Sequence, residues 1–157
     1  MFIIVGVLAV GVCLCCGICL VVFGSTIGIA LTQKGDIEKT IGEFMSAMDA
    51  KDADRAYALF SERGKKGTTL ADIEAMLQGN NYSLFEGYES VHVNNINVNI
   101  RMDSNQDEPQ GIVAKVSGTI SYAGGVTGDF DATLERHGGK WQLNSINITV
   151  PPDKVSP

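Results

Sequence analysis

The spacing of apolar residues divides the chain into three parts. Residues 2–31 carry no charged side chain and consist mainly of Ile, Val, Leu, Gly, Ala, Phe and Cys. From residue 36 to residue 78, apolar residues recur every three or four positions, which is typical of amphipathic helices. Beyond residue 90 the period changes to two, which is typical of strands with one buried face. The pattern predicts an apolar segment, then helices, then a sheet.

Three helices are predicted in the middle part, and cap residues place the beginnings of the first and the third. The first is predicted to begin at Asp36, as the N-cap that follows a break at Gly35, and the second to cover residues 53–60. The third is predicted to follow Thr69 as its N-cap, with Asp72 in the position that completes a capping box.

About four strands are predicted in the alternating part. Asn94-Asn95 adds a residue between two alternating runs, as a β-bulge does, and Asn144-Ser145 shifts the phase of the last strand in the same way. Gly124-Gly125 and Gly138-Gly139 mark hairpin turns. The residues expected to point inward are all apolar: Ile112, Ala114, Val116, Ile120, Phe130, Leu134, Ile146 and Ile148. Together these elements predict an α+β fold, with three helices packed on a curved antiparallel sheet.

The apolar segment is long enough to cross a membrane as one helix. Thirty residues rise roughly 45 Å in an α-helix, against about 30 Å of hydrocarbon. A cleaved signal peptide is not expected, because no basic residue precedes the run and the run is about twice the usual length. We predict a transmembrane helix anchor over residues 1–32, a short linker over 33–35, one domain over 36–150 and a tail over 151–157.

The side of the membrane on which the domain lies is less constrained. Lys34 and Lys39 follow the apolar segment, so the positive-inside rule favours a cytoplasmic domain. A very short N-terminal tail followed by a C-terminal domain is, in contrast, typical of an uncleaved signal anchor. We expect a single-pass protein with its domain on the extracytoplasmic side.

One face of the predicted membrane helix is rich in small residues. At ~100° per residue, five of them fall within a strip roughly 60° wide. These residues are Gly6, Cys13, Gly17, Gly24 and Gly28. Small residues let membrane helices approach closely, so the strip is expected to contact other transmembrane helices of a complex. The alternative is chance, because glycine is common in membrane helices.

The cysteines all lie in the same apolar segment, at Cys13, Cys15, Cys16 and Cys19. Their spacing lacks the turns of a zinc or iron–sulfur site, and no His or carboxylate is near. We expect them to act as small apolar side chains, while acylation stays open. The rest of the chain has no cysteine and therefore no disulfide.

Charge and motifs argue against several functions. The net charge is −6 and no run of Lys or Arg occurs, so nucleic acid is not an expected partner. His92 and His137 have no carboxylate that the sequence places beside them, and Asp129 and Asp131 share a strand face that should be solvated. We predict no catalytic residue, no metal site and no cofactor.

Two polar surfaces remain as candidates. Residues 64–67 (Gly-Lys-Lys-Gly) are predicted to form a basic loop, solvated rather than bound to a phosphate or an acidic headgroup. Asn94, Asn97 and Asn99 are predicted to form a polar sheet surface, although asparagine is poor in strands. That surface either faces a partner protein or keeps the sheet soluble without added charge.

Two short stretches resemble a known family. Residues 52–61 (DADRAYALFS) resemble the second helix of nuclear-transport-factor-2-like (NTF2-like) domains, and residues 138–143 (GGKWQL) resemble their last hairpin. The resemblance spans about residues 36–150 and is to the membrane-anchored bacterial members of the cystatin-like superfamily, whose function is unknown. It implies a cone-shaped roll with helices against a concave sheet, and it implies no activity.

The leading hypothesis is therefore a non-catalytic accessory subunit, whose helix docks into a larger membrane complex, such as an energy-transducing one. A second hypothesis is a membrane-tethered ligand-binding or sensing module, which would need an apolar cavity of several hundred Å³. A cone filled by Phe85, Phe130 and Trp141 would argue against it. A third is an enzyme of the NTF2-like class, with His92 or an aspartate inside the cone.

Overall fold

The computed structural model of the chain describes residues 33–102 and 108–155. The chain separates into two compact units, residues 1–35 and residues 36–157, and the second holds almost all of the described residues. Within the described part, no helix is long and apolar enough to cross a membrane. The predicted anchor, including Gly6, Cys13, Gly17, Gly24 and Gly28, lies outside the described residues.

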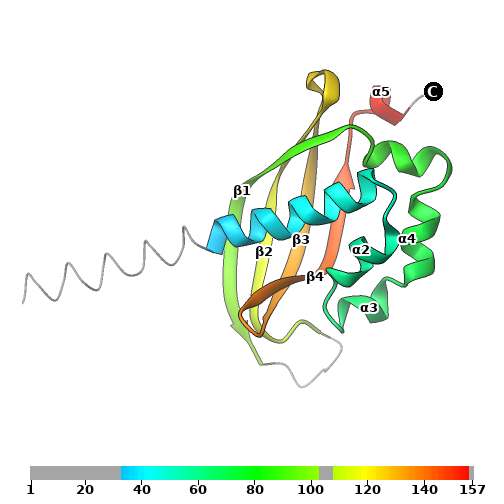
Figure 1. Cartoon of the computed structure of the whole chain (residues 1–157). Helices are drawn as coiled ribbons and strands as arrows, with labels where there is room; N and C mark the ends of the chain where they lie inside the picture. The colour runs from blue at the N-terminus through cyan, green and yellow to red at the C-terminus, as the bar shows by residue number, and fades with distance from the viewer. Residues whose placement is uncertain (1–32, 103–107, 156–157) are drawn as a thin grey trace, which may run out of the picture. The chain divides into compact units, whose positions relative to one another are not determined.

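Helices come first along residues 36–157 and strands follow (Figure 1). The helical part comprises a helix over residues 33–49, α2 (Ala53–Ala58), α3 (Gly64–Gly67), α4 (Leu70–Met76) and the 3₁₀ helix η1 (Gly79–Leu84). The sheet comprises β1 (Tyr88–Arg101), β2 (Gly111–Tyr122), β3 (Thr127–His137) and β4 (Lys140–Thr149), with the 3₁₀ turn η2 (Ala123–Gly125) after β2. A short helix, α5 (Pro152–Val155), ends the described chain.

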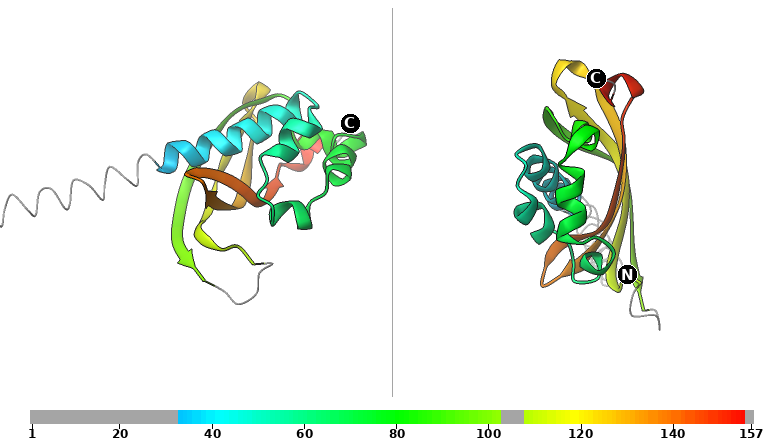
Figure 2. Two further views of the ribbon diagram at one scale, coloured as in Figure 1. Left: turned by 60° about the horizontal axis from the view of Figure 1, so that its bottom comes forward. Right: turned by 90° about the vertical axis from the view of Figure 1, so that its right-hand side faces the viewer.

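The strands form one antiparallel sheet in the order β1-β2-β3-β4. The sheet is curved, and the helix of residues 33–49 lies with α2, α3 and α4 against one of its faces (Figure 2). No described helix covers the other face. The predicted α+β architecture, with helices on a curved antiparallel sheet, is confirmed.

Both predicted irregularities of the strands are present. The pairing of β1 with β2 shifts between Val93 and Asn95, so Asn94 is the extra residue of a bulge. In β4, Leu143 and Ser145 face consecutive residues of β3, which leaves Asn144 as a second extra residue. The β3–β4 turn has positive φ at Gly138 (57°) and Gly139 (82°), as tight hairpins require.

The core fills the space between the helices and the covered face of the sheet. The helix of residues 33–49 contributes Ile37, Ile41, Phe44, Met45 and Met48, all at most 2% exposed. Most of the residues predicted to point inward are buried: Ala114, Val116, Ile120, Phe130 and Leu134. Ile112, Ile146 and Ile148 are half-buried and pack against this core.

The first helix begins earlier than predicted. Residues 33–35, expected to be a linker, are already helical, so Gly35 does not break the helix and Asp36 is not its N-cap. The backbone oxygen of Asp36 instead accepts a hydrogen bond from the Thr40 hydroxyl (3.0 Å). A glycine costs a helix about 1 kcal/mol, which the burial of Ile37 and Ile41 one turn later outweighs.

The predicted basic loop is also helical, since residues 64–67 form α3. Gly64 is buried, and a Cβ at this position would lie 2.6 Å from the backbone oxygen of Leu143 in β4. The Ser61 hydroxyl accepts a hydrogen bond from the Gly64 N–H (3.0 Å). Glycine at this position therefore permits close packing against β4 and does not mark a loop.

Candidate functional site

His92 has a carboxylate neighbour that the sequence did not reveal. Its Nδ1 lies 3.5 Å from Oε1 of Glu38, which belongs to the helix of residues 33–49. The same Glu38 oxygen accepts a hydrogen bond from the Val93 N–H (2.8 Å). The His92 side chain is 66% exposed and the Glu38 side chain 26%, so the imidazole lies in solvent while the carboxylate is half-buried. The clearest role of the pair is to fasten the helix to the edge of β1.

The other predicted ionisable candidates remain apart. His137 is exposed at the end of β3, and Asp129 and Asp131 are exposed on the uncovered face of the sheet, as their spacing predicts. Within residues 33–102 and 108–155, no group of three or more His, Cys, Asp or Glu side chains could hold a metal.

Polar side chains form rows across the uncovered face of the sheet. The pairing of the strands aligns them as Asn97–Lys115–Thr133–Ser145, Asn95–Ser117–Asp131–Asn147 and His92–Thr119–Asp129–Thr149. Hydroxyl and amide groups predominate, and each offers hydrogen-bond donors and acceptors. Of the asparagines that the sequence singled out, Asn97 thus belongs to a surface that extends over all four strands.

Of the three asparagines predicted to face a partner, two are joined to each other by a hydrogen bond. Asn99 donates a hydrogen bond from its side-chain amide to the side-chain oxygen of Asn97, and both side chains are exposed. Asn94 is exposed too, but it is the bulged residue of β1 and has no partner residue in the pairing of β1 with β2.

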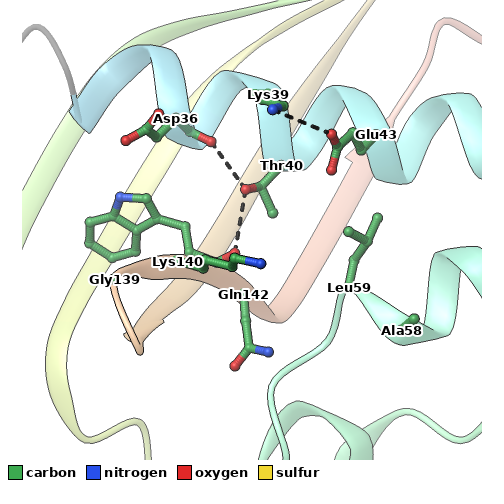
Figure 3. A pocket seen from close by; sticks show the side chains of 10 residues that line it. Asp36, Lys39, Thr40, Glu43, Ala58, Leu59, Gly139, Lys140 and Gln142 are labelled. Carbon is green, nitrogen blue, oxygen red and sulfur yellow. Dashed lines mark hydrogen bonds and ion pairs between the residues drawn. The ribbon is translucent and has the colours of Figure 1, made fainter.

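A polar cleft of about 510 Å³ lies between the helix of residues 33–49 and the β3–β4 hairpin (Figure 3). Its lining residues are Asp36, Lys39, Thr40, Glu43, Ala58, Leu59, Gly139, Lys140, Trp141 and Gln142. The charged residues from the helix are spaced three and four apart, which places them on one helix face. That spacing is a signal in the sequence that could have found this wall of the cleft.

The walls of the cleft are held together by hydrogen bonds. The Thr40 hydroxyl lies 3.4 Å from the backbone oxygen of Trp141, so the helix and the hairpin are joined at this point. Lys39 and Glu43, one turn apart on the helix of residues 33–49, form an ion pair at 4.0 Å along one wall. The indole Nε1 of Trp141 is buried and has no hydrogen-bond partner among the described residues. Since this donor is buried, a ligand in the cleft does not reach it without a movement of the ring.

A second, apolar cavity of about 200 Å³ lies between the helices and the sheet. Its lining residues are Phe44, Phe60, Thr68, Ile73, Met76, Leu84, Phe85, Ser145, Ile146, Asn147 and Ile148. Phe44 meets Phe60 and Phe85 edge to face, with ring centroids 5.7 and 6.2 Å apart. Phe85, Phe130 and Trp141 are each at most 5% exposed, so aromatic rings fill much of the space between the helices and the sheet.

One buried ion pair joins distant segments. Arg63 lies 3.1 Å from a carboxylate oxygen of Glu135, whose residue is 5% exposed. The other oxygen of Glu135 accepts the backbone N–H of Gln110 (3.3 Å). A paired and hydrogen-bonded carboxylate of this kind holds the segment before α3 and the residue before β2 to β3.

Comparison with known proteins adds a description of the fold. No family model matches the chain, and no curated protein matches its sequence. A protein of unknown function with a cystatin-like fold from Nostoc punctiforme is 17% identical, with a TM-score of 0.47 over 76% of this chain and 91% of that one. An NTF2-like protein with a cystatin-like fold from Novosphingobium aromaticivorans is 15% identical, with a TM-score of 0.46 over 81% and 88%. Values this low do not assign the chain to a family.

Proposed function

We propose that this chain is a non-catalytic accessory subunit of a membrane protein complex. Its segment 1–32 spans the bilayer once, and its folded domain braces the extracytoplasmic surface of the complex. The domain is a bacterial NTF2-like roll, an assignment supported by the resemblance of residues 52–61 and 138–143 to that family. The strip formed by Gly6, Cys13, Gly17, Gly24 and Gly28 contacts the transmembrane helices of the partner.

The uncovered face of the sheet carries this proposal. All the described helices that pack on the sheet lie on its other side, so within the described residues the strands present a broad surface that no helix covers (Figure 2). Its rows of Asn, Ser and Thr side chains offer many hydrogen-bond donors and acceptors and few charges. Polar, hydrated interfaces of this kind are common in protein assemblies.

Purification of the tagged full-length chain from its native membranes in mild detergent tests the proposal. The wild type is expected to bring stoichiometric membrane proteins with it. Asn147→Arg places a large charge on the uncovered face, far from β1, and should weaken their recovery roughly tenfold if that face is desolvated in the complex.

Asn80→Arg is the matched control, because Asn80 is equally exposed but lies in η1, on the helical side. It should leave recovery unchanged. A chain that purifies without any membrane protein, as a monomer or as a complex of identical chains, would overturn the proposal.

A membrane-tethered ligand-binding module is the second candidate, supported by the apolar cavity of about 200 Å³. It ranks second because pockets for small molecules usually measure ~300–1,000 Å³ and aromatic rings crowd this one. A chain that purifies alone with a small apolar molecule bound, detected by native mass spectrometry, would favour it. The His92–Glu38 pair, whose imidazole is exposed, gives an enzyme of the NTF2-like class weaker support.

A further inference from the structure

The two edge strands of the sheet, β1 and β4, differ in how far other segments of the chain cover them. At the β4 edge, the Leu143 N–H donates to the backbone oxygen of Leu59 (2.9 Å), and the Ser61 N–H donates to the backbone oxygen of Leu143 (2.7 Å). Phe60 forms a parallel bridge with Leu143 there. The chain segment between α2 and α3 therefore covers this edge at Leu143.

The other edge is β1, and only its first half is protected. The Glu38 carboxylate accepts a hydrogen bond from the Val93 N–H, and register shifts near Tyr88 and at residue 94 interrupt the regular pairing of the strand. Bulges and inward-reaching charges are the usual means by which proteins block unwanted pairing at an edge. Beyond Asn94, no main-chain partner other than β2 lies along β1 in the described part of the chain.

The unprotected half also has an apolar face. Ile96, Val98 and Ile100 alternate along β1 on the face that carries the core, and Met102, just beyond the end of the strand, keeps the same spacing. Val98, Ile100 and Met102 are 37%, 74% and 92% exposed. The opposite face carries the uncharged residues Asn95, Asn97 and Asn99. Residues 94–100 contain no charge and no proline, the two features that most often prevent edge pairing.

We propose that residues 96–102, the end of β1 and the residue after it, pair antiparallel with the same residues of a second copy of this chain, around a two-fold axis at Asn99. In this register Ile96 faces Met102 of the second copy and Val98 faces Ile100, so every exposed apolar side chain meets another. Asn97 faces Arg101, and Asn99 faces its own counterpart. Both sheets then continue across the axis as one.

The residues that pair favour a second copy over other occupants of this edge. Although two chains of net charge −6 repel each other, Arg101 is the one charged residue among residues 96–102 and it faces Asn97, so this register brings no two like charges face to face. A lipid surface fits poorly, because the acidic residues Asp103, Asp107 and Glu108 follow the strand in sequence and anionic lipids repel them. The antiparallel arrangement also places the helix-covered halves of the two β1 strands at opposite ends, away from the axis.

Sedimentation of the full-length chain in detergent, measured against protein concentration, tests the pairing. The wild type is expected to form dimers. Val98→Lys should weaken dimerisation by on the order of tenfold. The dimer contains the Val98–Ile100 contact twice, once on each side of the two-fold axis, so the substitution removes two apolar contacts. Met76→Lys is the matched control: Met76 in α4 is also 37% exposed, and its replacement should leave the dimer intact.

Cross-linking tests the register. In a chain whose four native cysteines are replaced by alanine, Asn99→Cys should oxidise readily to a disulfide dimer, because facing residues lie ~4.5–5.5 Å apart. Thr119→Cys, on the central strand β2, should not. A monomeric wild type, equal effects of the two lysine variants, or cross-linking no faster at residue 99 than at residue 119 would each overturn the proposal.

The sedimentation measurement also distinguishes this dimer from one that is held together by the predicted membrane helix. A dimer held by that helix would be lost in Gly24→Leu and kept in Val98→Lys, and that result would also overturn pairing through β1.

Discussion

Burial sets the chemistry of Tyr122, which alternates with Ile120 on the inward face of β2. It is 1% exposed, and its hydroxyl donates a hydrogen bond to the backbone oxygen of Leu84 (2.8 Å). The Lys154 ammonium lies 4.0 Å from the centre of its ring. Burial, with a smaller contribution from Tyr88, raises the pKa of Tyr122 to about 12. The phenol therefore stays neutral in the folded protein at a pH where it ionises in the unfolded chain.

This raised pKa predicts a loss of stability at alkaline pH. Since the folded-state pKa lies above the ordinary value of 10.0, the contribution of Tyr122 is complete below pH 10 and is lost as the pH rises towards 12. The wild type should lose roughly 2–3 kcal/mol more than Tyr122→Phe across this range. Urea unfolding of both proteins at several pH values measures the difference, and equal pH dependence would contradict the assignment.

Lys154 lies against the Tyr122 ring, and its pKa is shifted in the opposite direction. Burial lowers its pKa, against the opposing effects of Glu86 and Asp49. Its ammonium donates a hydrogen bond to the backbone oxygen of Glu86 (2.8 Å), which fastens α5 to the start of β1. The C-terminal segment, expected to be a simple tail, is thereby part of the folded unit.

Among the helices, α4 follows its local signals most closely. The Thr69 side chain accepts a hydrogen bond from the Asp72 N–H (3.2 Å), and the Asp72 carboxylate accepts one from the Thr69 N–H (2.8 Å). This is the capping box predicted from the sequence. Hydrogen bonds from the Thr69 hydroxyl and backbone lower the pKa of Asp72.

Thr69→Ala should therefore destabilise the protein by about 1 kcal/mol, the usual cost of losing an N-cap. The pKa of Asp72 should rise in the same variant, because the hydroxyl that lowers it most is gone. Denaturant unfolding and NMR titration of the carboxyl measure the two effects. Thr127→Ala, at an exposed position at the start of β3, is the control. An unchanged pKa of Asp72 would refute this account.

The chain as a whole divides into an apolar segment and a folded domain. The domain buries its apolar residues in its own core, whereas residues 2–31 carry no charged side chain. In the proposed function, the glycine strip contacts the transmembrane helices of the partner and the uncovered face of the sheet contacts its extracytoplasmic surface.

Gly24→Leu tests the strip, because a bulky side chain at its centre should keep partner helices from close approach. Recovery of the membrane partners in mild detergent is expected to fall by roughly tenfold, the equivalent of one or two lost packing contacts. Gly11→Leu is the matched control, since residue 11 lies about 140° from the centre of the strip. Equal recovery with both variants would show that the strip is not a docking face.

Local signals predicted much of the domain correctly. The change of period separated helices from strands, and the bulges at Asn94 and Asn144 and the turn at Gly138 were found because each depends only on neighbouring residues. The same reasoning failed at residues 33–35 and 64–67. In both places a glycine suggested a break, and packing with distant residues kept the backbone helical.

The sequence by itself determined the order of the elements, the inward face of each strand and the lack of charge at residues 94–100, since these properties follow from spacing along the chain. Only the tertiary structure decided that Glu38 meets His92, that Arg63 meets Glu135 across 72 positions and that one half of β1 stays uncovered. Such contacts join residues far apart in the sequence. They form when packing of the core fixes where each side chain lies, and no local pattern records that outcome.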